Sequence, residues 1–223
     1  MSERVVIVGS SGGIGCALAE AAELRGADVV RLGRPSIDID DETSFARAAE
    51  AAGDGLSHVI IATGLLHLGT HAPERDLRQI SADWMLESFR VNTVLPALAA
   101  KHFLPRLRKD ERAVFAALSA RVGSISDNRL GGWHSYRASK AALNQVVRTL
   151  SVEMKRKNPH AIVSALHPGT VDTGMSKPFQ RGVPEGKLFD AAKSAGHLWH
   201  VIDGLKPEDS GGFFAWDGAP IPY

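Results

Sequence analysis

The stretch VVIVGSSGGIG at residues 5–15 has the pattern that decides the fold of this chain. Its four successive apolar residues predict a strand that is buried on both faces, as in a parallel sheet. The glycines that follow permit a tight turn, and Ile14, Ala17, Leu18 and Ala21 then recur at helical spacing. A strand, a glycine-rich turn and a helix in this order predict the first unit of an α/β domain.

The same alternation continues along the chain. Strand-like apolar runs lie at residues 27–32, 58–63, 112–119, 161–166 and 212–215, and helical patterns lie at 41–52, 81–102, 135–157 and 189–202. Strands that alternate with helices predict right-handed crossovers and a Rossmann-type, doubly wound parallel sheet with helices on both faces. Because no repeat or linker interrupts the pattern, we expect one domain over residues 1–223.

Composition and charge argue against several classes of partner. The 26 Lys and Arg residues nearly balance the 25 Asp and Glu residues, which gives no electrostatic reason to expect nucleic acid or an anionic membrane as a partner. The single cysteine excludes an intrachain disulfide and favours a cytoplasmic location. We expect neither a signal peptide nor a membrane span, because the apolar runs are too short. We also expect no metal site, because the pairs His67/His71 and His197/His200 lack a nearby third ligand.

The glycine-rich turn has a use beyond folding. The start of a helix presents unpaired N–H groups and a positive dipole end, and glycines let a ligand approach the backbone closely. We therefore predict that the turn binds the pyrophosphate of a dinucleotide, through Gly9, Ser11, Gly13, Ile14 and Gly15. The alternative is a tight strand–helix turn that binds nothing.

A second motif stands on the helix predicted at 135–157. Tyr136 and Lys140 are four residues apart, so their side chains lie on one helical face. A nearby ammonium favours the phenolate, so the spacing predicts a lowered tyrosine pKa and a general acid/base that works near neutrality. The alternative is a pair of surface residues on an amphipathic helix.

The glycine turn, the stretch YRASK at 136–140 and the stretch PGTVDT at 168–173 together resemble the short-chain dehydrogenase/reductase family. The segments 123–132 and 214–223 are most similar to its C-factor and sniffer-like carbonyl reductase branch. The resemblance implies that Tyr136 exchanges a proton with a carbonyl or alcohol substrate while a nicotinamide cofactor carries the hydride. It also implies that Lys140 binds the nicotinamide ribose and that Asn92 helps to place a relay water beneath the lysine.

The resemblance extends to the rest of the cofactor site. Arg34 follows the second strand, where a basic residue tolerates the 2′-phosphate of NADP, so we expect NADP(H) to be favoured over NAD(H), unless Arg34 is merely a solvated charge. The remaining implied contacts are Asp38 and Ile39 beside the adenine, Ala62, Thr63 and Gly64 along the backbone, and Pro168, Gly169, Val171 and Thr173 at the carboxamide. Residues 174–205 are expected to form a lid over the substrate.

Two departures from the family pattern stand out. Asp38 comes only four residues after Arg34, where relatives place a helix and a strand, so we expect a shortened sheet edge near residues 34–38. Ala120 occupies the place of the serine that usually polarises the substrate carbonyl. The chain offers three other hydroxyls for this role, with Ser119 as the first choice before Ser124 and Ser126. Loss of such a donor costs about 10²–10³ in rate.

These patterns predict an NADP(H)-preferring reductase or dehydrogenase that interconverts a carbonyl and an alcohol, with Tyr136, Lys140, Asn92 and Ser119 at the catalytic centre. A dinucleotide-binding regulatory protein with little turnover is the alternative that Ala120 favours. An enoyl reductase or epimerase fits the tyrosine–lysine spacing less well. The resemblance also implies a homodimer or homotetramer.

Overall fold

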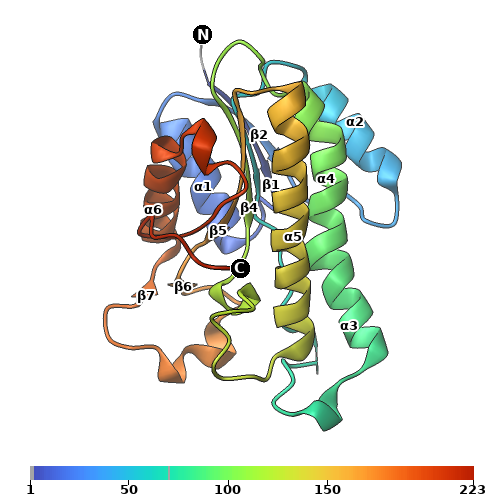
Figure 1. The fold of residues 1–223 in the computed structure, drawn as a ribbon, viewed down its shortest axis with the longest axis vertical. Helices are drawn as coiled ribbons and strands as arrows, with labels where there is room; N and C mark the ends of the chain where they lie inside the picture. Colours follow the sequence, from blue (N-terminus) through green and yellow to red (C-terminus); the bar gives the residue numbers. More distant parts are fainter. Residues whose placement is uncertain (1–2, 70) are drawn as a thin grey trace.

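The computed structural model describes residues 3–69 and 71–223, and its centre is a parallel sheet (Figure 1). Six strands pair in the order β2-β1-β3-β4-β5-β8, and every pair is parallel. The strands are β1 (Arg4–Val8), β2 (Asp28–Leu32), β3 (His58–Ile61), β4 (Ala113–Leu118), β5 (Ala161–His167) and β8 (Phe213–Ala215). A separate pair consists of β6 (Thr170–Val171) and β7 (Leu188–Phe189). The predicted doubly wound sheet is confirmed.

Helices cover both faces of the sheet, and each face has its own hydrophobic core (Figure 1). On one face lie α1 (Gly13–Leu24) and α6 (Ala191–Gly204), and on the other lie α2 (Glu42–Ala52), α4 (Leu95–Phe103) and α5 (His134–Lys157). The helix α3 (Ala82–Phe89) packs beside α5. Short 3₁₀ turns complete the fold: η1 (Leu77–Gln79), η3 (Leu104–Arg106), η4 (Arg121–Gly123), η5 (Lys177–Gly182) and η6 (Pro207–Asp209).

The sheet ends early on the side of β2, as expected from the spacing of residues 34–38. Within the described ranges no strand pairs with the outer edge of β2, and residues 33–41 form a loop that leads directly into α2. That helix begins where its sequence indicates, because the Asp41 side chain accepts a hydrogen bond from the Thr43 N–H at 3.0 Å. The end of β2 adjoins the glycine turn, because the Gly9 N–H donates to the Leu32 carbonyl at 2.8 Å, and Arg34 in the loop that follows is exposed.

The helix predicted over residues 81–102 is not a uniform α-helix. Between α3 and α4 the chain forms a π-helical turn, η2 (Arg90–Val94), with Asn92 in its centre. A π turn has one more residue per hydrogen-bonded loop than an α turn, and such turns are frequent at functional sites. The apolar periodicity did not reveal it, because a single wide turn leaves the flanking helical pattern intact.

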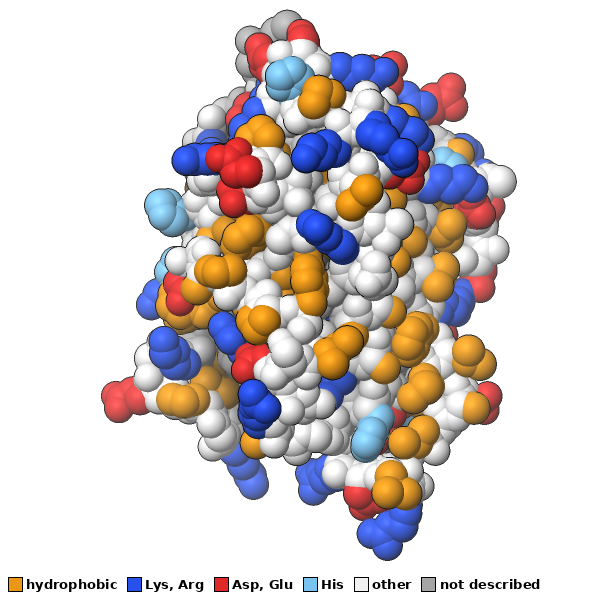
Figure 2. Space-filling model, in the orientation of Figure 1, with side chains coloured by type: hydrophobic (Ala, Val, Ile, Leu, Met, Phe, Trp, Pro, Cys, Tyr) orange, Lys and Arg blue, Asp and Glu red, His pale blue; other side chains and the backbone are white. Residues whose placement is uncertain are grey.

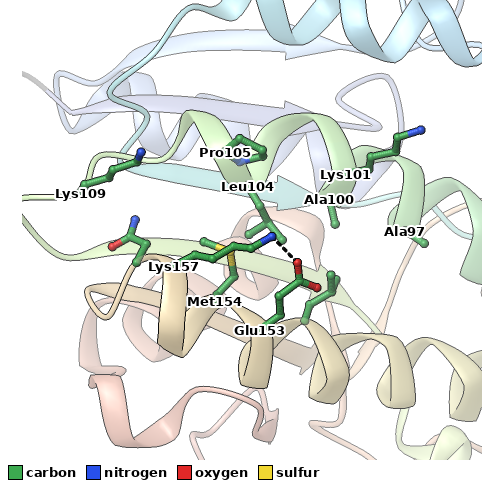
Figure 3. Close-up of a pocket in the computed structure, with 11 residues that line it drawn as sticks. Ala97, Ala100, Lys101, Leu104, Pro105, Lys109, Glu153, Met154 and Lys157 are labelled. Carbon is green, nitrogen blue, oxygen red and sulfur yellow. Dashed lines mark hydrogen bonds and ion pairs between the residues drawn. The ribbon is translucent and has the colours of Figure 1, made fainter.

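The outer surface mixes hydrophobic and charged side chains (Figure 2). Over the described residues, no helix has both the length and the apolar content needed to cross a membrane. A large groove lies between α4 and α5 and has a volume of about 660 Å³ (Figure 3). Its lining includes Leu104, Met154 and the lysines Lys101 and Lys157, and Lys157 forms an ion pair with Glu153 at 2.5 Å. No residue of the predicted cofactor or catalytic motifs lines this groove, so the functional site is elsewhere.

Candidate active site

The motifs predicted from the sequence meet at a cavity of about 220 Å³ beside the carboxyl ends of β4 and β5. The carboxyl edge of a doubly wound parallel sheet is where such folds bind ligands. The cavity is lined by Ile14 of the glycine turn, Ser119 after β4, Tyr136 of α5, and Thr173 after β6. One cavity thus joins segments that are more than a hundred residues apart in the chain.

The glycine turn has the geometry of a phosphate cradle. A Cβ at Gly15 would lie 2.2 Å from the Gly9 carbonyl oxygen, and one at Gly13 would lie 2.8 Å from the Thr173 Cγ2. Gly9 adopts a positive φ of 91° and donates its N–H to the Leu32 carbonyl at 2.8 Å. Among the described residues no side chain caps the start of α1, so the first N–H groups of that helix are open to a ligand. These glycines and free N–H groups fit a dinucleotide phosphate.

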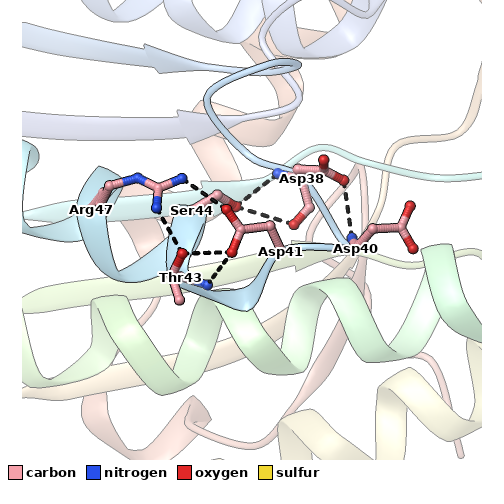
Figure 4. A network of polar contacts seen from close by, with 6 residues as sticks. All are labelled: Asp38, Asp40, Asp41, Thr43, Ser44 and Arg47. Atoms are coloured by element: carbon pink, nitrogen blue, oxygen red, sulfur yellow. Dashed lines mark hydrogen bonds and ion pairs between the residues drawn. The ribbon is translucent and has the colours of Figure 1, made fainter.

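The predicted adenine end lies on the loop after β2. Arg34 is exposed, and within the described part of the chain no carboxylate forms an ion pair with it. Asp38 belongs to a polar network that fastens this loop to α2 (Figure 4). Its N–H donates to Ser44 Oγ at 2.9 Å, and its carboxylate accepts from the Asp40 N–H at 3.0 Å. Ile39 packs against the core, so the loop is held next to the end of β2.

The end of β3 is tied to the π turn by Asn92. The strand was predicted to run to Thr63 but ends at Ile61, so Ala62, Thr63 and Gly64 all follow it. The fully buried Asn92 amide accepts from the Leu65 N–H at 2.7 Å and donates to the Leu65 carbonyl at 2.8 Å. It also donates to Ser139 Oγ on α5 at 3.0 Å. Asn92 therefore fixes the loop after Gly64 against the helix that carries Tyr136.

Lys140 is buried, and Tyr136 is partly buried and lines the cavity. The Lys140 ammonium donates to the Leu118 carbonyl at 2.8 Å and lies 5.9 Å from the centre of the Tyr136 ring. Burial lowers the pKa of Lys140 to about 7. The position Gly64 adjoins this ammonium, since a Cβ there would be 3.7 Å from Nζ. The predicted helical pair is thus present on one face of α5.

The prediction of a lowered tyrosine pKa is wrong for the protein without ligands. Burial raises the pKa of the Tyr136 hydroxyl, because the phenolate would lose its hydration. Lys140 does not offset this effect, since its own pKa is depressed by the same dry surroundings and its ammonium is directed at the Leu118 carbonyl. Spacing along a helix indicated that the two groups are close, but it could not indicate how much water surrounds them.

The hydroxyls available near position 120 are already engaged. Ser119 lines the cavity and is 4% exposed, and its hydroxyl donates to Asn144 Oδ1 at 2.7 Å. Ser124 accepts from the Asp127 N–H at 3.1 Å, and Ser126 donates to the Tyr223 carbonyl at 2.7 Å. Of these three serines, only Ser119 lines the cavity. Its role stays a prediction, and that role would require its hydroxyl to turn away from Asn144.

The segment after β5 forms the opposite wall and the cover of the cavity. Pro168, Gly169, Val171 and Thr173 all line it, and Gly169 has a φ of 80°. The predicted lid begins here, and its Met175 and Phe179 also line the cavity. The Phe179 ring packs edge-on against Trp133, with 5.4 Å between ring centres. The first part of the lid therefore contacts the residue that precedes α5.

Two residues at this site were missed by the sequence analysis. Glu74 is 2% exposed, and its carboxylate accepts from both the N–H and the hydroxyl of Ser135, in the first turn of α5. His167 ends β5 and lines the cavity. A single buried acid does not alter the hydrophobic periodicity from which helices and strands are predicted. A histidine before a proline does not by itself indicate a cavity, because that depends on where its strand lies in the sheet. In the described ranges no cluster of His, Cys, Asp and Glu could hold a metal ion.

Comparison with known proteins identifies the family and the fold. Residues 35–183 match the short chain dehydrogenase family. The C-signal protein of Myxococcus xanthus is 38% identical over 140 residues, which cover 62% of this chain and 78% of that protein. The fold is shared with carbonyl reductase Sniffer of D. melanogaster, at a TM-score of 0.82 and 23% identity, and with NADPH-bound carbonyl reductase from chicken fatty liver, at 0.81 and 25%. Both structural alignments cover 100% of each chain. The chain belongs to the short-chain dehydrogenase/reductase family of NAD(P)-dependent oxidoreductases.

Proposed function

We propose that this protein is an NADP(H)-preferring oxidoreductase that interconverts a carbonyl and an alcohol, with Tyr136 as the general acid/base. The observation that carries the proposal is the single cavity in which Tyr136 lies beside residues of the glycine turn and of the segment Pro168–Thr173. Bound NADP(H) would supply or accept the hydride. The proposed contacts to it are those predicted from the sequence: the glycine turn, Arg34, Asp38–Ile39, Ala62–Gly64 and residues 168–173.

The protonation state of Tyr136 suits the direction of reduction. Burial raises the pKa of its hydroxyl, so the phenol carries its proton at neutral pH and can donate it to the oxygen of a carbonyl that is being reduced. Lys140 is proposed to bind ribose hydroxyls and, once charged, to stabilise the phenolate that remains. Asn92 is proposed to hold the backbone after Gly64 in place for a relay water.

The preference for NADP(H) rests on Arg34. Its exposed guanidinium follows the strand β2 beside the glycine turn and lacks a carboxylate partner among the described residues. A guanidinium is well matched to a phosphate group, whereas NAD lacks the 2′-phosphate. The solved carbonyl reductase from chicken fatty liver has NADPH bound, which supports the same preference.

Binding and turnover test the proposal separately. NADPH and NADH are titrated with tryptophan fluorescence as the readout, and NADPH consumption is followed over a panel of aldehydes, ketones and quinones. Tyr136→Phe should abolish turnover and leave NADPH affinity within about threefold. The chain has one other tyrosine, Tyr223, so Tyr223→Phe is the matched control and should keep turnover. Arg34→Ala should weaken NADPH about tenfold and NADH little, whereas Arg78→Ala, at another exposed arginine, should change neither.

Ala120 favours a second function, that of a dinucleotide-binding regulatory protein with little turnover. The residue lines the cavity where the family usually has a serine hydroxyl, and one relative is named C-signal. Tight NADPH binding without turnover of any compound in the panel would support this function. Loss of a measured activity in Tyr136→Phe would exclude it.

The remaining expectations concern assembly and location. We propose a homodimer or homotetramer through the face of α4 and α5, where a groove lies close to the exposed side chains of Val94 and Val152. Light scattering during size-exclusion chromatography measures the oligomer directly. Of the predicted lid over residues 174–205, the part from Ala191 onward is the helix α6, which packs into the hydrophobic core, so we propose that residues 174–190 alone act as the substrate lid. We also propose that the protein works in the cytoplasm, as its single cysteine suggests.

A further inference from the structure

We propose that His167 donates to the substrate's carbonyl oxygen the hydrogen bond that a serine at position 120 would otherwise provide. The inference rests on the proposed carbonyl chemistry of this site and names a catalytic residue that the family pattern does not assign. It answers the question raised by Ala120, which places only a methyl group at the cavity wall.

Two of the serine hydroxyls that line the cavity are already engaged. The Ser119 proton is directed at Asn144 Oδ1, at 2.7 Å, and the Ser176 hydroxyl is directed at the Val171 carbonyl. Both residues line the cavity, but their donors are used within the protein. Tyr136 must give up its proton during reduction, so a second donor at the oxygen has to be another group of the cavity wall.

His167 stands opposite Ser119, the residue before Ala120, where β4 and β5 end. The strands β4 and β5 are parallel, with Leu118 opposite Leu166, and the Ser119 N–H donates to the Leu166 carbonyl at 2.8 Å. The next residue of β5 is His167, and it lines the same cavity as Ala120 and Tyr136. An imidazole at this point of the wall can reach the space that the missing hydroxyl would serve.

The ring of His167 is free to act as a donor. Its Nδ1 is buried and has no hydrogen-bond partner among the described residues. A neutral imidazole carries one N–H donor and one acceptor, and no protein contact at Nδ1 fixes which nitrogen holds the proton. Burial lowers the pKa of His167 to about 4, so the ring is neutral at pH 7. A neutral imidazole polarises a carbonyl by hydrogen bonding without competing with Tyr136 as the acid.

A rescue experiment tests the inference. Kinetics with NADPH are measured for the wild type, Ala120→Ser, His167→Phe, His167→Gln and the double variant with Ala120→Ser and His167→Phe. His167→Phe should lower kcat/KM by about 10²–10³-fold, the loss expected for one donor to the oxyanion, with NADPH affinity unchanged. His167→Gln keeps an N–H donor and should lose less than about tenfold. Ala120→Ser should change the wild type less than threefold and should restore at least tenfold to His167→Phe.

Each outcome bears on one claim. The role of His167 is overturned if Ala120→Ser changes kcat/KM by the same factor in the wild type and in His167→Phe. It is also overturned if kcat/KM of His167→Phe stays within threefold of the wild type. If Ser119→Ala or Thr170→Val lowers kcat/KM by about 10²–10³-fold while His167→Phe stays active, the donor is the serine or the threonine and not His167. If His167→Phe does not fold, a tenfold or larger gain from Ala120→Ser alone overturns the inference, because no donor was then in place. A wild type without turnover refutes the proposed function itself and, with it, this inference. His160→Gln, at an exposed histidine, is the control and should be neutral.

Discussion

Replacing Glu74 by alanine should destabilise the protein and disturb Tyr136. The carboxylate of Glu74 accepts from the Ser135 N–H at 3.2 Å through each of its oxygens and also from the Ser135 hydroxyl. The 24-residue helix α5 has no side-chain cap of its own, because Trp133 precedes it in the left-handed region with φ 52°. Glu74 therefore acts as the cap from another segment, and its negative charge faces the positive end of the helix.

The size of the effect follows from these contacts. A hydrogen bond to a charged group contributes about 1.5–3 kcal/mol, and loss of a helix cap costs about 0.5–2 kcal/mol. Because Ser135 is fully buried, its N–H and hydroxyl would stay without partners after truncation. We expect Glu74→Ala to lower the free energy of unfolding by about 3–4 kcal/mol, which for a chain of this size is about 6–16 °C in Tm. Glu74→Gln keeps one acceptor oxygen and should lose about half as much.

Urea unfolding followed by tryptophan fluorescence measures this free energy, and NADPH turnover is measured on the same variants. Because Ser135 adjoins Tyr136, turnover in Glu74→Ala should fall even at temperatures where the variant is fully folded. Glu50→Ala removes an exposed glutamate on α2 and should stay within about 0.5 kcal/mol of the wild type. A Glu74→Ala variant within about 1 kcal/mol of the wild type would show that this carboxylate does not cap α5.

Three further outcomes are expected. Gly15→Ala should reduce NADPH affinity at least tenfold in a fluorescence titration, because the new Cβ would lie 2.2 Å from the Gly9 carbonyl oxygen. The control Gly196→Ala adds its Cβ in open space on α6 and should leave the affinity unchanged. Equal NADPH affinities for the two variants would contradict a close-packed glycine turn. Burial lowers the pKa of His58 to about 3, so below about pH 6.5 the unfolded chain takes up a proton that the folded His58 does not. In urea unfolding, His58 should therefore contribute a loss of about 2 kcal/mol between pH 7.5 and pH 5, and His58→Leu should reduce the loss by this amount. The loss that remains is expected from His167, whose pKa burial lowers to about 4, and a loss unchanged by His58→Leu would refute the low pKa of His58. Burial lowers the pKa of Lys140 to about 7, so this lysine keeps its proton to higher pH in the unfolded chain than in the folded one. The free energy of unfolding of the wild type should therefore rise from pH 7 to 9 relative to that of Lys140→Met. Parallel curves of unfolding free energy against pH for the two proteins would refute the low pKa.

Local patterns in the sequence were sufficient to predict the first strand and helix, the start of α2 and the edge of the sheet. The strand β1, the glycine turn and α1 were predicted from apolar runs and glycine spacing, because these patterns reflect backbone conformation within a few residues. The start of α2 at Asp41 was predicted in the same way, since a cap interacts with the N–H two residues later. The early end of the sheet after β2 followed from the short distance between Arg34 and Asp38.

Only the tertiary structure decided the environment of each chemical group. It showed that Asn92 stands in a π turn and clamps the loop after Gly64, and that burial raises the pKa of Tyr136 instead of lowering it. It also brought Glu74 to the start of α5 and His167 to the cavity that Ala120 lines, from positions that no motif marks. Periodicity and spacing determine conformation over a turn or a strand, whereas hydration and hydrogen-bond partners depend on segments that meet only when the whole chain has folded.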